Sequence, residues 1–432
     1  MNTFHISPLD RSLQPDIQAK IDNLNKPLGS LGTLESLALQ ICLVQQTLSP
    51  VLRHPCHLLL GGDHGIEREG VSATPREVTW QQMVNFTRGG GGVNMFCRQH
   101  GFHLRIVDMG VDHDLSPFYP APGRLPAASP SVPASPAPSW LPAVSPSAPA
   151  SPFPGQLPAV SPSVSASPAP GRLPAASPSA SASPVPGWLP AVSPSAPASP
   201  LPILNRKIAP GTHNFLHGPA MTDEEFSRAI DAGAALADDC HREGSNIICI
   251  GEMGAANTSP SSIWMSLLCD IPLDECIGAG SGLNDEAIVH KRHVLRQALD
   301  NFLKWKEESG KRKEAALSYF GGFEMVGAIG AMLRAAELRM LIMVDGFIMT
   351  ACALAAVHLH PACRDYMIFG HCGDESGHRR MLQFLNAQPL LTLGLRLGEG
   401  TGALCAYPII DSAVRMINEM NNFQDARITK YF

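Results

Sequence analysis

Glu399 is the carboxylate that the sequence places best for chemistry. It lies in the glycine-rich, mostly apolar stretch Gly394-Leu-Arg-Leu-Gly-Glu-Gly-Thr-Gly-Ala403. The preceding run, 389–397, reads as a buried strand and 401–410 as an apolar helix, so we expect Glu399 at the carboxyl end of a strand. A carboxyl group there loses hydration, which raises its pKa toward neutrality. The pattern therefore predicts a general base.

Four further apolar runs end on glycine beside a polar or charged residue: Gly62-Asp63-His64-Gly65, Gly251-Glu252, Asp345-Gly346 and Gly370-His371. An ordinary strand-terminating turn explains any one of them. Because the carboxyl ends of parallel strands meet at one edge of a sheet, all five together indicate a single active-site cleft.

An anion site is predicted at Gly251-Glu-Met-Gly-Ala-Ala-Asn-Thr-Ser-Pro-Ser-Ser262. This segment follows a strand and opens a helix with small residues, free N–H groups and hydroxyls. It lacks the Walker and dinucleotide fingerprints. A second glycine turn, 278–282, leads to Lys291, which is either a counter-charge for a phosphate or a solvated helix lysine. The run Gly89–Gly92 either approaches a ligand closely or forms a flexible turn between helices.

Metal and cysteine chemistry are poorly supported by the sequence. The one His-x-x-x-His, His213 to His217, lies among glycines and prolines rather than on a convincing helix, and no repeated carboxylate cluster appears. None of the eleven cysteines lies in a nucleophile motif with an evident histidine base. We expect no metal and no cofactor.

The elements that would position these residues follow an α/β pattern. Short apolar runs predict an open, mainly parallel sheet with strands at 56–63, 103–110, 246–252, 340–346, 366–370 and 390–398. Longer periodic segments predict helices on both faces, as in Rossmann-like folds, at 77–86, 223–243, 287–306, 325–338 and 346–358. Segments 1–50 and 413–432 are expected to form a small helical subdomain, and 51–116 with 203–412 the α/β core.

Residues 117–202 form a low-complexity insertion in this core. Its composition is mostly Pro, Ala, Ser, Val, Leu and Gly, and leucines recur with a period of 16 from Leu125 to Leu189. About five prolines per unit favour polyproline II, so we expect a disordered or extended loop. The alternative is a ligand for a polyproline-binding partner.

Charge and composition exclude several classes of partner. The net charge of -6 and the absence of basic runs give no attraction for nucleic acid or an anionic membrane. No apolar stretch makes a convincing membrane span. Cysteines without Cys-x-x-Cys pairs and an N-terminus without a secretion signal favour the cytoplasm.

Several long motifs in order carry a family resemblance: Lys26-Pro-Leu-Gly-Ser-Leu-Gly-Thr-Leu-Glu35, Asp63-His-Gly65, Thr87-Arg-Gly89, His217-Gly-Pro-Ala-Met-Thr222, 251–260, Asp345-Gly-Phe347 and 395–402. Together they resemble the nicotinate-nucleotide:dimethylbenzimidazole phosphoribosyltransferase family of cobalamin assembly, over nearly the whole chain except the insertion. The resemblance implies phosphoribosyl transfer from nicotinate mononucleotide to 5,6-dimethylbenzimidazole with inversion, giving α-ribazole 5′-phosphate and nicotinate, in a homodimer.

The resemblance also implies roles for single residues. Glu399 would be the base that takes the benzimidazole N–H proton, and Glu252 a second glutamate near the ribose. Phosphate and ribose contacts would fall on Gly251, Gly254, Asn257, Thr258, Gly280, Ser281, Gly282 and Lys291, with Asp345 and Gly346 near the nucleotide. The base pocket would include Thr74, Gln82 and Leu397.

The chain departs from the family after His371, where Cys372-Gly-Asp-Glu375 replaces the common Ser-Ala-Glu and removes a hydroxyl. The preferred azole or phenolic base stays open. Two alternative functions remain: a related N-glycosyl transferase or nucleotide hydrolase that uses the same glutamates on another base, and a non-catalytic scaffold that displays the insertion. The presence of both Glu252 and Glu399 argues against the scaffold.

Overall fold

The computed structural model describes residues 3–120, 200–280, 282–310 and 313–430. Its core is one parallel sheet in the order β3-β2-β1-β4-β5-β6, which is the strand order of a doubly wound nucleotide-binding sheet. The strands are β1 (Cys56–Gly62), β2 (His103–Gly110), β3 (Ile203–Asn205), β4 (Ile247–Met253), β5 (Leu341–Val344) and β6 (Met367–Phe369). The predicted α/β class is confirmed.

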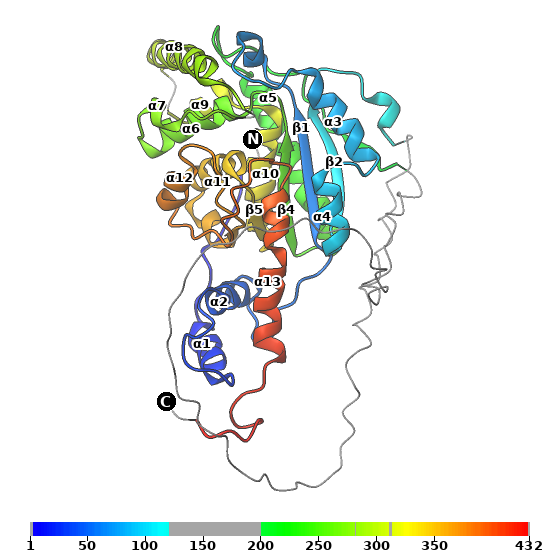
Figure 1. Cartoon of the computed structure of the whole chain (residues 1–432), viewed down its shortest axis with the longest axis vertical. Helices are drawn as coiled ribbons and strands as arrows, with labels where there is room; N and C mark the ends of the chain where they lie inside the picture. The colour runs from blue at the N-terminus through cyan, green and yellow to red at the C-terminus, as the bar shows by residue number, and fades with distance from the viewer. Residues whose placement is uncertain (1–2, 121–199, 281, 311–312, 431–432) are drawn as a thin grey trace, which may run out of the picture. The chain divides into compact units, whose positions relative to one another are not determined.

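Helices cover both faces of the sheet (Figure 1), which is why the central strands β1 and β5 are buried along their whole length. One face carries α3 (Glu77–Thr87), α4 (Gly92–His100) and α13 (Thr401–Glu419), and the other α5 (Asp223–Arg242), α10 (Phe323–Glu337) and α11 (Phe347–Leu359). Beside them lie α6 (Thr258–Cys269), α7 (Leu273–Cys276), α8 (Asp285–Ser309), α9 (Ala316–Phe320) and α12 (His378–Phe384). Short 3-10 turns occupy Gly65–Glu69, Ser116–Phe118, Lys313–Ala315 and Pro361–Tyr366.

The two ends of the chain meet in a helical subdomain. Helices α1 (Gln14–Asn23) and α2 (Thr33–Gln45) pack together, and α2 packs against α13. An isolated antiparallel bridge joins Leu24 to Asn422. Helix α13 is continuous through residue 413, where the sequence suggested a boundary, so one helix belongs to both the core and the subdomain.

The predicted strand at 390–398 is wrong. Only Leu391 joins the sheet, through an isolated parallel bridge to His371, and residues 392–397 are irregular and mostly exposed. The neighbouring β6 is only three residues long, and Gly394 has a φ of 66°, which is incompatible with an extended strand. Apolar residues here line a cleft instead of filling the core.

Both described ends of the predicted insertion are attached to the sheet. Ile203 begins the short edge strand β3, which pairs with β2 and was not expected from the sequence. The backbone N–H of Leu201 donates to the carbonyl of Thr87 at 2.9 Å, and the Tyr119 hydroxyl donates to Asp108 at 2.6 Å. Residues 121–199 of the predicted insertion lie outside the described residues.

Candidate active site

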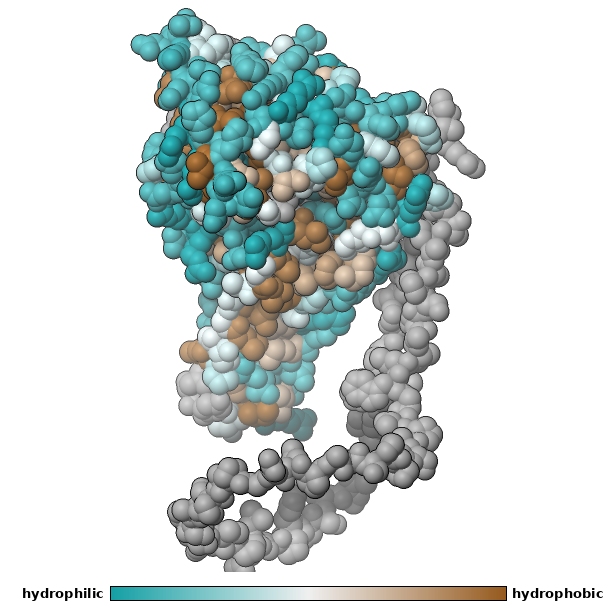
Figure 2. Space-filling view, turned by 45° about the horizontal axis from the view of Figure 1, so that its top comes forward, coloured by the Kyte–Doolittle hydropathy of each residue, from teal (hydrophilic) through white to brown (hydrophobic). Residues whose placement is uncertain are grey.

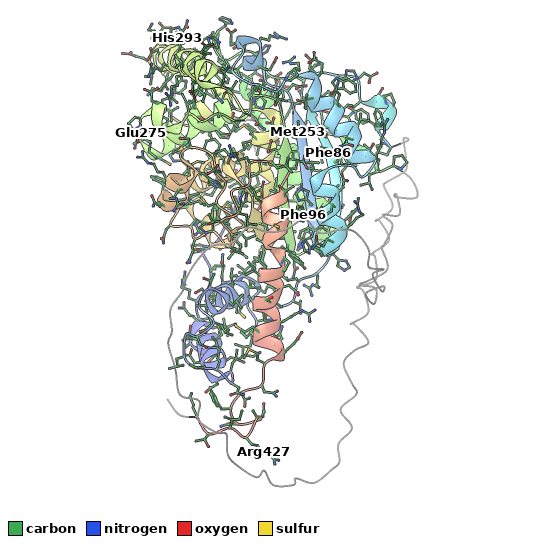
Figure 3. All side chains as sticks on the ribbon, viewed as in Figure 1. Phe86, Phe96, Met253, Glu275, His293 and Arg427 are labelled. Carbon is green, nitrogen blue, oxygen red and sulfur yellow. The ribbon has the colours of Figure 1, made fainter. Side chains whose placement is uncertain are left out.

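A cleft lies at the carboxyl edge of the sheet, where β4 ends at Met253 (Figure 3). It has a cavity volume of about 150 Å³. Its walls come from segments far apart in the sequence, mainly 252–258, 345–349, 395–398 and parts of 371–375. In open α/β sheets this edge is where ligands bind.

Glu399 lies in a left-handed turn at this edge, and not at a strand end as expected. Gly398, Glu399 and Gly400 have φ angles of 79°, 62° and 79°, a region that glycine adopts without steric cost and glutamate does not. The turn rests on two strands: the carbonyl group of Glu399 contacts Gly251 of β4, and Gly400 contacts the ring of His57 of β1. The turn therefore holds its carboxylate in place through backbone contacts.

The environment of Glu399 favours proton uptake. The residue is 5% exposed, and burial raises the pKa of its carboxyl group. The charge of Asp345 raises this pKa further, whereas the backbone N–H groups of Val93 and Gly92 lower it. The Val93 N–H donates to Oε2 of Glu399 at 3.2 Å. The net upward shift suits a general base.

Glu252 is a second buried carboxyl group in the cleft. Burial raises its pKa to about 8, despite the hydrogen bond that the Asn257 amide donates to its Oε2. The charges of Glu324, Asp345 and Glu399 add to this upward shift. This shift favours the protonated form of Glu252 at neutral pH, and a nearby positive charge would favour the ionised form.

A buried ion pair, Asp345 with His371, was missed as a pair by the sequence reasoning. Both residues line the cleft, with 3.4 Å between Oδ1 of Asp345 and Nε2 of His371. Burial alone would raise the pKa of Asp345, but His371 and the N–H groups of Ala403 and Gly346 lower it below its usual value. The sequence does show both residues, each at the end of a predicted strand. It does not show that they touch, because that contact depends on how the strands are arranged in the sheet.

The predicted anion site is assembled around Thr258. Gly254, Asn257, Thr258 and Gly280 line the cleft, and α6 begins at Thr258. Lys291 is 1% exposed and donates from Nζ to Oγ1 of Thr258 at 2.9 Å, so it is not a solvated helix lysine. Burial lowers its pKa to about 8.

Of the other predicted site residues, some line the cleft and some do not. Gly346, Thr74 and Leu397 line the cleft, and so does Glu375 of the segment that departs from the family. Gln82 does not line it, and its side chain instead accepts a hydrogen bond from Asn85 at 3.0 Å. Gly282 is also outside the lining, and Gly251 lies beneath the Glu399 turn. Ser281 lies outside the described residues.

The fifth strand end, Asp63-His64, lies behind the cleft. His64 and Glu324 form a buried pair, with 2.6 Å between Nε2 and Oε1, packed under Gly254 and Gly322. Its influence on the site is electrostatic, through the effect of Glu324 on Glu252. Four of the five strand-end motifs thus contribute directly to the cleft or to the turn above it.

No group of three or more His, Cys, Asp or Glu side chains in residues 3–120, 200–280, 282–310 and 313–430 has an arrangement that could hold a metal ion. Within the same ranges, no helix combines the length and the apolar character needed to cross a membrane.

Comparisons with known proteins agree on one family. A family model described as a phosphoribosyltransferase matches residues 6–137 and 190–428. The chain is 46% identical to the nicotinate-nucleotide--dimethylbenzimidazole phosphoribosyltransferase of Parabacteroides distasonis, over 100% of both chains. It is 37% identical to the protein of the same name from Dechloromonas aromatica, over 99% of both. The crystal structure of the phosphoribosyltransferase from Thermus thermophilus matches with a TM-score of 0.72 and 28% identity, covering 98% of this chain and 100% of that one.

Proposed function

Because this chain belongs to the nicotinate-nucleotide:dimethylbenzimidazole phosphoribosyltransferase family, we propose that it transfers the phosphoribosyl group of nicotinate mononucleotide to 5,6-dimethylbenzimidazole. The products are nicotinate and α-ribazole 5′-phosphate, for the lower nucleotide loop of cobalamin. The observation that carries this proposal is a cleft lined by Glu252, Thr258 and Gly398. Glu399 directly follows Gly398, and Lys291 is hydrogen-bonded to Thr258.

The phosphate of the nucleotide binds at the start of α6. The Lys291 ammonium group and the Thr258 hydroxyl, which are 2.9 Å apart, lie beside the glycine turn at Gly280. The N-terminal end of α6, which begins at Thr258, adds partial positive charge to this site. An incoming phosphate raises the pKa of Lys291 above its value of about 8, so the charged form of the lysine binds the phosphate.

The transfer step exchanges one C–N bond for another. One ring nitrogen of the benzimidazole attacks the anomeric carbon from the face opposite nicotinate, while the bond to the pyridinium nitrogen breaks and its electron pair leaves with nicotinate. The proton on the other ring nitrogen passes to Glu399. The attack inverts the anomeric carbon, and the flat apolar base lies against Leu397 and Thr74.

Glu252 stabilises the positive charge of the nucleotide and of the ribosyl centre. It contacts the Glu399 turn at Gly398 and is held by the Asn257 amide. The pyridinium of nicotinate mononucleotide supplies the positive charge that ionises it. Positive charge that develops on the ribose during transfer then faces a carboxylate that is already oriented.

The test is a direct assay with purified protein, nicotinate mononucleotide and 5,6-dimethylbenzimidazole, with nicotinate and α-ribazole phosphate followed by chromatography. We expect both products in equal amounts and no nicotinate when the base is omitted. Nicotinate release without base would favour a hydrolase, and product with another azole alone would favour a transferase of different base specificity. No turnover of any of these substrates would refute the proposed function and favour the scaffold.

We also propose that the chain forms a homodimer. Figure 2 shows a band of hydrophobic residues on the face viewed there, and α4 carries an exposed Met95. Apolar area of this kind is stabilised by association. Sedimentation velocity should give twice the mass of the chain, and a single species with the mass of one chain at micromolar concentration would refute the dimer.

A further inference from the structure

The N-terminus of α4 contacts the carboxylate of Glu399. Helix α4 begins at Gly92, and the N–H of Val93, its second residue, donates to Oε2 of Glu399 at 3.2 Å. The N–H of Gly92 acts on the same carboxyl group and lowers its pKa along with that of Val93. The first four N–H groups of a helix have no partner within the helix and carry partial positive charge. Here a side chain of the same protein supplies the partner.

The glycines before α4 are required for this approach. A Cβ atom at Gly92 would lie 3.1 Å from Cδ2 of Leu397, 3.4 Å from Cγ2 of Thr401 and 3.5 Å from Oε2 of Glu399. At Gly91 a Cβ atom would overlap the ring of Phe86. The run Gly89–Gly92 connects α3 to α4, and it permits a close backbone approach to the carboxylate of Glu399.

The start of α4 is itself fixed. Asn94 accepts a hydrogen bond from the N–H of Gly91 and donates one to the carbonyl of Phe86, each at 2.9 Å. Phe86 belongs to α3, so the two helices and their glycine connection are tied together directly in front of Glu399. The N–H groups of Gly92 and Val93 are thus held in place by residues of α3 and α4 that do not line the cleft.

Little else around Glu399 favours its negative charge. Asp345 faces it from the end of β5 and opposes ionisation, and Glu252 lies under Gly398. His57 lies under Gly400 and is fully buried, and burial lowers its pKa to about 4, so it is neutral. His371 lies beside Gly402 and is paired with Asp345. The N–H groups of α4 are the favourable contacts that the described residues offer to the carboxylate.

We propose that the first turn of α4 is a positioning element for the general base: its N–H groups hold Oε2 of Glu399 and leave Oε1 to take the proton from the azole. The inference rests on the proposed function, in which Glu399 is that base. It assigns a role to backbone groups of Gly92 and Val93, and it explains why glutamate is fixed in a left-handed conformation. Proton transfer then needs no search for the correct orientation of the carboxylate.

Two substitutions at one position separate the N–H group from the side chain. Val93→Pro removes the N–H, and proline is tolerated in the first turn of a helix because no helical hydrogen bond is lost there. Val93→Ala keeps the N–H and removes most of the buried side chain, so it sets the baseline for packing. Relative to Val93→Ala, we expect kcat of Val93→Pro at neutral pH to fall about tenfold, with an unchanged KM for nicotinate mononucleotide.

The dependence on pH identifies the cause of that loss. Without the N–H the ionised carboxylate is less stable, so the acid limb of kcat against pH should move up by about one unit in Val93→Pro, and activity should recover as the pH rises. Coincident acid limbs in Val93→Pro and Val93→Ala would overturn the proposal. If Val93→Pro does not fold, Gly92→Pro removes the other N–H group of the contact at the first helical position, where proline is favoured, and Gly92→Ala keeps it. Coincident acid limbs in Gly92→Pro and Gly92→Ala would also overturn the proposal.

A measurement without turnover separates this inference from the proposed function. Infrared difference titration of each Val93 variant against the same variant carrying Glu399→Gln gives the pKa of the Glu399 carboxyl group directly. A higher pKa in the proline variant supports the positioning role even if the wild type fails the transferase assay. An equal pKa in both variants refutes it even if the wild type is active.

Discussion

At the scale of single residues, Glu399 is constrained twice, by a left-handed backbone and by hydrogen bonding of its carboxylate. A non-glycine residue with a φ of 62° costs on the order of 1 kcal/mol, and such strain persists where the surroundings determine the conformation. Here Gly251 and His57 support the turn from below. Both the conformation of the backbone and the hydrogen bond to the carboxylate therefore limit which residue can replace Glu399.

Replacing Glu399 by glutamine should remove the base and keep its shape. The amide oxygen can still accept the Val93 N–H, so we expect the turn and the nucleotide site to be retained. In Glu399→Gln, kcat should fall about 100- to 10,000-fold, the range associated with general base catalysis. Single-turnover kinetics measure the loss, and calorimetry should show little change in affinity for nicotinate mononucleotide. Turnover close to that of the wild type would exclude Glu399 as the base.

Glu252 should release a proton when the nucleotide binds. Its pKa of about 8 favours the protonated form at pH 7 before the nucleotide binds, and the pyridinium charge favours the ionised form. We expect Glu252 to release up to one proton per site at pH 7 and almost none well above pH 8, where it is already ionised. Above pH 8 Lys291 takes up a proton on binding in the wild type and in the Glu252→Gln control alike, so the difference between the two proteins reports Glu252. Calorimetry in buffers of different ionisation enthalpy measures this number, and Glu252→Gln is the matched control. If the wild type and Glu252→Gln released the same number of protons, the released proton would not come from Glu252.

At the scale of elements, the strands and main helices follow from the sequence because buried parallel strands are continuous apolar runs that end on glycine. The same criterion failed at 390–398, since side chains such as Leu395 and Leu397 are as apolar in a cleft wall as in a core. The three-residue β3 is too short to give a pattern. Glu252 and Glu399 were found from their local surroundings, whereas the contact of Val93 with Glu399 joins positions 306 residues apart and depends on the fold.

The Glu399 turn packs directly on Gly251 of β4. A methyl group added at Gly251 should therefore reduce both stability and turnover. In Gly251→Ala the added Cβ would overlap the carbonyl of Glu399 and the N–H of Gly400. We expect the free energy of unfolding to fall by about 1–3 kcal/mol and kcat by about a hundredfold, because the base is displaced. Denaturant titration and steady-state kinetics measure both. Gly218→Ala is the matched control, since nothing lies within 4 Å of its Cβ; equal behaviour of the two variants would contradict the described seating.

At the scale of the whole molecule, the ends of the predicted insertion are held independently of what lies between them. Leu201 and Tyr119 make their hydrogen bonds to residues of the core, and the family model leaves out 138–189. We therefore expect that replacing 121–199 by a short Gly/Ser linker leaves a soluble enzyme with kcat within about threefold of the wild type, because closing a loop between fixed ends costs little. Insoluble protein, or a large loss of kcat in a folded variant, would show that the segment is needed.

Helix α13 runs from the turn that holds Glu399 to the terminal helix α2, against which it packs, and it contains Pro408 in its interior. Proline has no N–H to donate to the carbonyl of Leu404, so the helix is weakest one turn before it. The segment from Thr401 to Tyr407 is anchored separately, through the hydrogen bond from the Ala403 N–H to Asp345 at 2.8 Å. If the terminal helices move relative to the core, we expect α13 to bend one turn before Pro408, while Thr401 beside Glu399 stays held through Ala403.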